Sequence, residues 1–261
     1  MRIGVVAFTN TLPLAEGLER HLPQAAIVRT IPSRIADGLE AGDLDVGLVP
    51  VAALAGNPAW HVVPGLGIAA EGAVRSVLVL SRVPVERIRR LALDPASRTS
   101  NRLARLWLRH VHGVVPESVA GPADPVRRLE AGDAAVVIGN DALFWTAPVA
   151  ERVDLGRAWT DWTGLPFVFA VWAGPGANDP GLAAGLEACY RENAERLPAL
   201  AERAAAGDPA RRDLIESYLR TNIRYRLGAR ETEAMARFLG MAGADAAPAP
   251  SREGESHVPL G

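Results

Sequence analysis

The sequence of 261 residues predicts an α/β fold built from two similar lobes. Three observations lead to this prediction. Short apolar runs that suit buried parallel strands alternate with amphipathic helical segments. The segment Leu-Glu-Ala-Gly-Asp occurs at residues 39–43 and again at 129–133. Two further apolar runs, 74–81 and 167–173, are candidates for strands that cross from one lobe to the other.

Both copies of the five-residue repeat are predicted to end an amphipathic helix and to run into a short apolar strand. Gly42 and Gly132 lie just past the last helical turn, where a C-cap residue takes a positive φ. After the strand the backbone breaks, at Pro50 in the first copy and at Gly139 in the second, and a helix of small residues follows. We therefore expect each copy to deliver its loop to a shared cleft.

The first part of the chain alternates strand and helix. A continuous apolar run at residues 3–8 predicts a strand that is buried on both faces of a parallel sheet. A helix follows over 12–21, with Pro13 in its first turn, where proline is tolerated. A strand at 26–30 precedes Ser33, which is the expected N-cap of a helix over 34–41. This alternation predicts right-handed crossovers.

The later helices and strands are predicted from the same capping residues and apolar patterns. Asp124, Asp179 and Asp208 each precede a proline and predict an N-cap followed by the first helical residue. The remaining expected elements are strands at 61–63, 67–70, 74–81, 91–93 and 167–173, and helices at 101–110, 157–162 and 231–241.

These elements predict one lobe from residues 1–79 plus 170–241 and another from residues 80–169. The tail, 242–261, is rich in Ala, Pro, Gly and Ser and is predicted to be disordered. Two α/β lobes joined by two crossing strands describe a periplasmic-binding-protein-like fold of the second type. Ligands of such folds lie between the lobes, at the carboxyl ends of strands and the N-termini of helices.

The net charge, the cysteine count and the length of the apolar runs limit the classes of partner and the cellular location that we expect. A net charge of −2 gives no reason to expect nucleic acid or an anionic membrane as a partner. The single cysteine, Cys189, excludes an internal disulfide and a cysteine-based metal cluster. No apolar run approaches eighteen residues, and the N-terminal run is too short for a secretion signal. We expect a cytoplasmic protein with a small-molecule ligand; the oligomeric state is left open.

Three polar clusters are expected to face the cleft: Thr9-Asn10-Thr11, residues 97–101 and Gly139-Asn140-Asp141. Backbone N–H groups and the helix dipole favour a carboxylate at such places, by roughly 0.3–2 kcal/mol. Each cluster taken alone is better explained as an N-cap. Together, from two lobes, they favour a small anionic ligand. Ser76, a hydroxyl within an apolar run, fits a structural role and a ligand contact equally well.

The clusters contain no histidine, and the sequence has no metal-ligand spacing, catalytic triad or phosphate-binding glycine loop. We therefore expect neither metal nor cofactor. Trp159 and Trp162 are three residues apart on a predicted helix, which is more typical of core packing than of an aromatic binding wall.

Six motifs occur in order along the chain. They are Arg2-Ile3-Gly4, Asn10-Thr11-Leu12-Pro13-Leu14, Ser76-Val77-Leu78, Thr99-Ser100, Ile138-Gly139-Asn140-Asp141-Ala142-Leu143 and Trp162-Thr163-Gly164-Leu165-Pro166-Phe167-Val168-Phe169-Ala170-Val171-Trp172. Together they resemble the chorismate dehydratase family of the futalosine route to menaquinone. The likeness runs from residue 1 to about residue 240, and the last motif is long and specific. One departure is Asn140, where an aspartate is expected.

The resemblance implies cofactor-independent removal of water from chorismate to give 3-[(1-carboxyvinyl)oxy]benzoate. Because the cleft loops contain no histidine, we favour the enolpyruvyl carboxylate of the substrate as the proton acceptor, with Asn10 and Ser76 as catalytic residues that position and stabilise the reacting groups. The substrate-binding residues that the resemblance implies are Thr11, Thr99, Ser100, Gly139, Asn140, Asp141 and Phe167. Two alternative functions remain: a non-catalytic binding protein for a small anion, and the related 1,4-dihydroxy-6-naphthoate synthase. That synthase carries a Cys-Pro-Asn-Asp-type loop after its first strand, where this chain has Phe8-Thr9-Asn10-Thr11.

Overall fold

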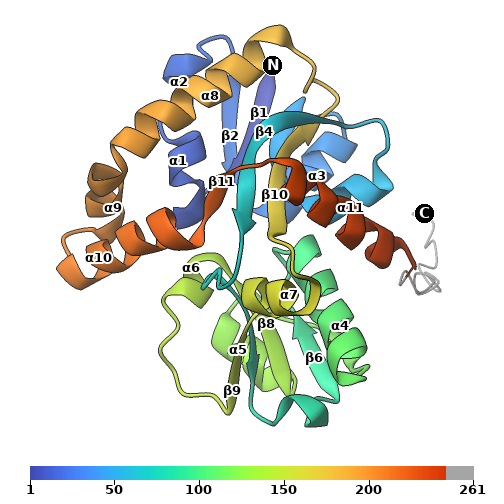
Figure 1. Cartoon of the computed structure of the whole chain (residues 1–261). Helices are drawn as coiled ribbons and strands as arrows, with labels where there is room; N and C mark the ends of the chain where they lie inside the picture. The colour runs from blue at the N-terminus through green and yellow to red at the C-terminus, as the bar shows by residue number, and fades with distance from the viewer. Residues whose placement is uncertain (245–261) are drawn as a thin grey trace, which may run out of the picture.

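The computed structural model describes residues 1–244, and two sheets carry the fold of this part of the chain (Figure 1). The first sheet has the order β11-β4-β10-β3-β1-β2, and the second has the order β7-β6-β8-β5-β9. The strands of the first sheet are β1 Arg2–Val6, β2 Ala26–Thr30, β3 Val46–Pro50, β4 His61–Ala70, β10 Phe167–Gly174 and β11 Arg224–Arg226. Those of the second are β5 Val77–Ser81, β6 Arg90–Leu93, β7 Glu117–Ala120, β8 Ala134–Ile138 and β9 Glu151–Asp154.

We call each sheet with its helices a lobe; the first lobe is the upper one in Figure 1. The helices of the first lobe are α1 Leu12–Ala15, α2 Leu18–His21, α3 Pro32–Glu40, α8 Pro180–Glu195, α9 Leu197–Ala205, α10 Pro209–Ser217 and α11 Ala229–Ala244. Those of the second lobe are α4 Arg98–His112, α5 Pro125–Ala131, α6 Gly139–Leu143 and α7 Leu155–Thr163. Four short helical turns complete the described chain: η1 Thr9–Thr11, η2 Val51–Gly56, η3 Val85–Arg87 and the π-helical η4 Tyr218–Asn222.

Helices cover both faces of the first sheet, with α1, α2 and α8 on one side and α3 and α11 on the other (Figure 1). This burial explains why β1 is apolar throughout its length: Ile3, Val5 and Val6 are all buried, and β1 pairs in parallel with β2 and β3. The predicted two-lobed α/β class is confirmed.

The two copies of the repeat form equivalent units. The first runs from α3 through β3 to η2, and the second from α5 through β8 to α6. Both strands are internal to their sheets. Gly42 has the expected positive φ of 77°, but the same expectation for Gly132 is wrong, because its φ is −140°. A Cβ at Gly132 would lie 2.8 Å from the carbonyl oxygen of Arg90, so close backbone packing accounts for glycine there.

The chain changes lobe at residues 71–76 and 164–166, between β4 and β5 and between α7 and β10. The predicted boundaries at 79 and 170 are therefore displaced. All of β5, from Val77 onward, pairs with β8 in the second sheet, and β10 pairs with β4 from Phe167 onward. The crossings are short connections, and the two strands expected to cross, β5 and β10, each lie wholly within one sheet.

Other differences have local causes. The helix predicted over 12–21 is divided into α1 and α2 at Gly17, whose φ is +67°. Ile31, not Ser33, is the N-cap of α3, because Pro32 takes the first helical position. The helix α11 continues to Ala244 with Ala242 fully buried, so the tail predicted from 242 is wrong for 242–244, and the rest of it lies outside the described residues. Among residues 1–244, no helix has the length and apolarity needed to cross a membrane.

Candidate active site

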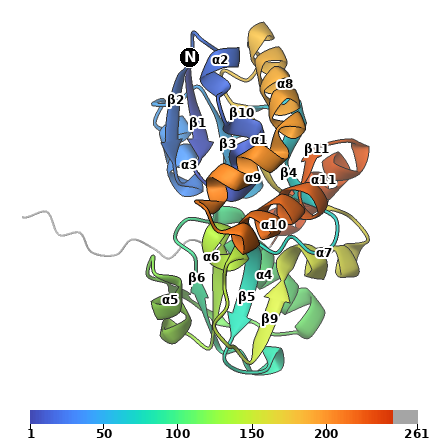
Figure 2. The ribbon, with the colours of Figure 1, turned by 90° about the vertical axis from the view of Figure 1, so that its left-hand side faces the viewer.

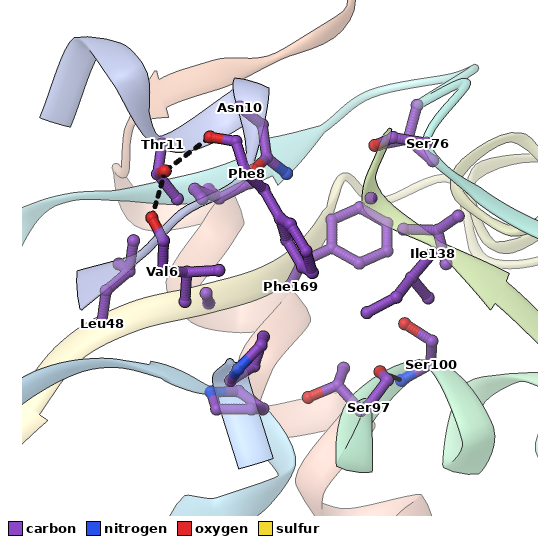
Figure 3. A pocket seen from close by; sticks show the side chains of 18 residues that line it. Val6, Phe8, Asn10, Thr11, Leu48, Ser76, Ser97, Ser100, Ile138 and Phe169 are labelled. Carbon is purple, nitrogen blue, oxygen red and sulfur yellow. Dashed lines mark hydrogen bonds between the residues drawn. The ribbon is translucent and has the colours of Figure 1, made fainter. Parts of the chain in front are cut away.

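A pocket of about 60 Å³ lies between the lobes, at the carboxyl ends of β1, β3 and β8 and at the N-terminus of α4 (Figure 3). Its polar lining comprises Asn10, Thr11, Ser76, Ser97, Thr99 and Ser100. Its apolar walls include Val6, Phe8, Leu48, Ile68, Ile138 and Phe169. The lining residues of this pocket include no charged side chain and no histidine. A ligand here would meet hydroxyls, an amide and backbone dipoles.

The turn η1 presents Asn10 to the pocket. The Thr11 hydroxyl lies 2.6 Å from the carbonyl oxygens of both Val6 and Phe8, so its hydrogen is used within the turn. The Tyr225 hydroxyl donates to the Asn10 carbonyl oxygen at 3.0 Å and holds the turn from the outside. The side-chain Oδ1 of Asn10 is buried, and no described residue donates to it. An acceptor in this state costs free energy unless a ligand or water satisfies it.

Ser76 is the last residue of the first crossing, where the backbone is strained. Arg75 has a φ of +64°, which is unusual for a residue with a side chain. The Asp154 carboxylate stabilises this conformation by accepting from the backbone N–H groups of Val74 at 3.0 Å and Arg75 at 2.6 Å. The buried Ser76 hydroxyl accepts from the Tyr218 hydroxyl at 2.7 Å. The strain therefore lies directly beside a polar group of the pocket.

The N-terminus of α4 lies on the opposite side of the pocket. In the view of Figure 3, Ser97 and Ser100 lie at one end, Asn10 and Ser76 at the other, and the Phe8 ring between them. Ser97 caps α4 by accepting from the Ser100 backbone N–H at 3.0 Å. The Thr99 hydroxyl accepts from the Ala52 backbone N–H at 3.1 Å and keeps its own hydrogen for a second partner. The dipole of this fifteen-residue helix favours an anion at the same place.

The third polar cluster joins the lobes. The Gly139 backbone N–H donates to the Ser76 carbonyl oxygen at 2.8 Å, and Asn140 Oδ1 accepts from the Thr9 backbone N–H at 3.1 Å. Of the three residues of this cluster, only Gly139 lines the central pocket. Asn140 and the exposed Asp141 line a neighbouring hollow on the other side of Phe8. The structure does not bring these two side chains to Asn10 and Ser76.

Phe167 also lies outside the pocket, although the resemblance assigns it to substrate binding. It is buried in an aromatic cluster, with ring centroids 5.2 Å from Trp159 and 5.0 Å from Phe238. Phe169, two residues along the same strand and 4.7 Å from Phe167 between ring centroids, lines the pocket instead. Trp159 is fully buried, as the spacing of the tryptophans indicates.

The sequence reasoning missed Phe8, Phe169 and Tyr218. Phe8 ends the first predicted strand and directly precedes the cluster Thr9-Asn10-Thr11, which was its available signal, and Phe169 lies within the last of the family motifs. Tyr218 had no signal, because it is 142 residues away from Ser76. Burial raises the pKa of Tyr218, which hydrogen bonding with Ser76 and Asn10 opposes, so the phenol stays protonated and acts as a donor. In residues 1–244 there is no group of three or more His, Cys, Asp or Glu side chains that could hold a metal ion.

Two α/β lobes, two crossings and a pocket between them define the class of periplasmic-binding-protein-like folds. The chain is similar to protein AF1704 from Archaeoglobus fulgidus, with a TM-score of 0.68 and 14% identity, over 93% of this chain and 96% of that one. It is also similar to the periplasmic aliphatic sulphonate binding protein SsuA from Escherichia coli, with a TM-score of 0.62 and 16% identity, over 94% and 91%. These likenesses show the fold.

Residues 1–244 match the family described as "Menaquinone biosynthesis", and the chain belongs to this family. A relative named chorismate dehydratase, from Thermus thermophilus, is 28% identical over 250 residues, which cover 86% of this chain and 89% of the relative.

Proposed function

We propose that this protein is a chorismate dehydratase, a lyase that removes water from chorismate to give 3-[(1-carboxyvinyl)oxy]benzoate. Family membership and the Thermus relative support this activity. The observation that carries the proposal for the site is the buried Oδ1 of Asn10, which has no hydrogen-bond donor among residues 1–244 and lies at the same end of the pocket as Ser76. The start of α4 lies across this uncharged pocket. The site offers hydrogen bonds and orientation and has no basic side chain among its lining residues.

The chemistry fits such a site. The ring carbon that bears the enol ether loses its proton, and the neighbouring carbon loses its hydroxyl group as water. The electrons of the broken C–H bond form the ring double bond that completes the aromatic ring. We assign the role of proton acceptor to the enolpyruvyl carboxylate of the substrate, which is held close to that proton. The protein then contributes orientation and preorganised dipoles, which are large sources of rate.

Asn10 and Ser76 are placed to contact the reacting groups. The Ser76 hydroxyl can donate to the departing hydroxyl group as negative charge develops there, and the Asn10 amide can hold the same region of the substrate. Across the pocket, Thr99 and Ser100 supply hydroxyls at the N-terminus of α4, where a carboxylate is favoured. In this scheme aromatisation provides the driving force, and no cofactor is required.

We propose that the lobes separate to bind chorismate and close around it. The pocket lies between the lobes, and residues at its edge make contacts from one lobe to the other. The Ala52 backbone N–H donates to Thr99, and the Thr9 backbone N–H donates to Asn140. Separation of the lobes would break both contacts and open the pocket to a substrate.

The direct test is to incubate the purified chain with chorismate, without added metal or cofactor, and to follow the product by mass and proton NMR. Conversion to 3-[(1-carboxyvinyl)oxy]benzoate supports the proposal, and a chelator in the same assay tests whether the reaction needs a metal ion. Calorimetric titration in parallel measures binding. If chorismate binds but is not converted, the proposed enzymatic activity is wrong, and the protein is better explained as a non-catalytic binding protein.

A further inference from the structure

A short stretch of the C-terminal part of the chain, residues 218–225, contacts both loops that carry the proposed reaction. It comprises η4 and the start of β11 and follows α10, which lies beside the second lobe in Figure 2. Arg211 of α10 places its guanidinium 4.0 Å from the centroid of the Phe144 ring, so this region touches both lobes. A π-helical turn such as η4 is rare and frequently occurs at functional sites.

Three side chains of this stretch reach the site loops. Asn222 donates from Nδ2 to the Ala73 carbonyl oxygen at 2.8 Å, within the first crossing. Tyr225 donates to the carbonyl oxygen of Asn10 at 3.0 Å. Tyr218, 1% exposed, donates to the Ser76 hydroxyl at 2.7 Å. Of these three contacts, only that of Tyr218 is made to a side chain placed in the reaction.

We propose that Tyr218 is a positioning residue for the dehydration, because its hydroxyl orients the hydroxyl of Ser76 toward the substrate. This inference rests on the proposed function. A serine hydroxyl has one hydrogen and accepts through its lone pairs. When Tyr218 supplies a hydrogen to Ser76, the hydrogen of Ser76 remains available to a different acceptor, and the pocket that Ser76 lines is where a substrate oxygen would lie.

Two further observations agree with a donor role. Burial raises the pKa of Tyr218, so the phenol keeps its proton across the pH range in which enzymes are assayed. Asn10 also interacts with the Tyr218 hydroxyl, so a single phenol is linked to both residues that are placed at the reacting groups. A buried phenol needs a hydrogen-bond partner, and the partner of Tyr218 is a side chain that lines the pocket.

The test compares four proteins in steady-state kinetics with chorismate: the unaltered chain, Tyr218→Phe, Ser76→Ala and the double variant. Tyr218→Phe is expected to lower kcat by about 10- to 100-fold, the range found when a group that orients a functional residue is removed. KM should change by less than about threefold, since a positioning effect on the departing group is felt mainly in the transition state. In the Ser76→Ala background, the same change should lower kcat by less than about twofold, because its target is gone.

Tyr190→Phe is the matched control, because it removes a phenol hydroxyl from a tyrosine that packs against Tyr225 but does not line the pocket. Circular dichroism and urea denaturation check that each variant folds. Should Tyr218→Phe not fold, 3-fluorotyrosine at position 218 keeps the ring and makes the hydroxyl a stronger donor, and kcat should then change by at least about twofold.

The outcomes separate the two proposals. If the unaltered chain does not convert chorismate, the proposed function fails and the role of Tyr218 fails with it. If the unaltered chain is active but Tyr218→Phe keeps its kcat, or the two losses multiply fully in the double variant, the positioning role alone is overturned. An unchanged kcat with 3-fluorotyrosine has the same consequence.

Discussion

The hydroxyl of Thr99 accepts a hydrogen bond from the backbone N–H of Ala52 at 3.1 Å, and the two residues belong to different lobes. Asn140 and Thr9 make a second such bond between the lobes. Arg98, next to Thr99, adds ion pairs with Asp37 at 2.6 Å and Glu40 at 2.7 Å. Residues at the pocket therefore also hold the lobes together, so the proposed separation of the lobes would break contacts made by residues that line the pocket.

Replacing Thr99 tests this coupling. Thr99→Val keeps the shape of the side chain but removes the acceptor for Ala52 and the donor proposed for a carboxylate. A hydrogen bond to a charged group contributes about 1.5–3 kcal/mol, so KM for chorismate should rise about 10- to 100-fold. Thr99→Ser keeps the hydroxyl and should remain within about threefold of the unaltered chain. Steady-state kinetics measures both, and an equal KM in the two variants would contradict the assignment.

The two ends of the pocket should differ in which kinetic constant they control. Ser100→Ala should raise KM, because Ser100 is placed to hold a carboxylate. Asn10→Ala and Ser76→Ala should instead lower kcat by about 10²–10³-fold, the usual cost of losing one preorganised donor at developing charge. Circular dichroism confirms folding. Equal, small effects at the three positions would mean that these residues serve only as caps and core.

Much of this arrangement could be predicted from the sequence because local signals and the fold agree. The apolar run of β1, the Asp-Pro starts of α5, α8 and α10, and the two repeated helix–strand units all have physical causes within a few residues. Parallel strands bring their carboxyl ends to one edge, so the order of strands and helices along the chain is enough to place Asn10 and Gly139 at one cleft.

What could not be predicted depends on contacts between distant parts of the chain. The Thr11 hydroxyl donates its hydrogen to the carbonyl oxygens of Val6 and Phe8, and the Asn140 side chain accepts from the backbone N–H of Thr9. No pattern in these segments shows that their polar groups are already partnered. Strands β7, β9 and β11 were also missed, since each has only three or four residues and lies at the edge of a sheet, where the apolar alternation is weak.

The second lobe should be sensitive to the loss of one partner of the buried ion pair between Asp94 and Arg128. Both side chains are almost fully buried, and Arg128 also donates to the carbonyl oxygens of Pro122, Ala123 and Val136. Arg128→Met leaves a buried carboxylate without its partner, at a cost of about 3–5 kcal/mol in the free energy of unfolding. Adding Asp94→Asn removes the stranded charge and should recover part of this loss in urea denaturation.

The same variant should depend on pH. Burial raises the pKa of Asp94, and Arg128 opposes this rise. Without Arg128 the folded-state pKa lies above that of the unfolded chain. The neutral carboxyl then supports folding below the unfolded pKa, and this support is lost as the pH rises through the folded pKa. The loss from Arg128→Met should therefore be larger at pH 8 than at pH 5, and a difference independent of pH would contradict this.

Cys189 should be inert in the folded protein. It is fully buried, with Sγ 3.5 Å from the carbonyl oxygen of Glu16, and burial raises the pKa of its thiol to about 12. Ellman's reagent at pH 8 should react only after the protein unfolds in urea. Because the folded pKa lies above the unfolded one, this group supports folding below about pH 8.5, and the support is lost as the pH rises toward 12. The free energy of unfolding should thus fall more steeply between pH 9 and 11 in the unaltered chain than in Cys189→Ala. Rapid reaction of the folded chain with Ellman's reagent would contradict the burial of the thiol.

Gly139 should be required both for its backbone conformation and for the position of Phe8. Its φ is +65°, and a Cβ there would lie 3.1 Å from three atoms of the Phe8 ring. Gly113 is a matched control, because its φ is +67° and nothing lies within 4 Å of the corresponding Cβ position. Each alanine variant should lose about 1–2 kcal/mol of stability from the left-handed backbone alone. Only Gly139→Ala should also displace the ring that divides the pocket from the neighbouring hollow, and so lower kcat/KM. Kinetics and urea denaturation of the two variants, side by side, separate strain from contact; an equal activity in both would show that Phe8 has no part in shaping the pocket.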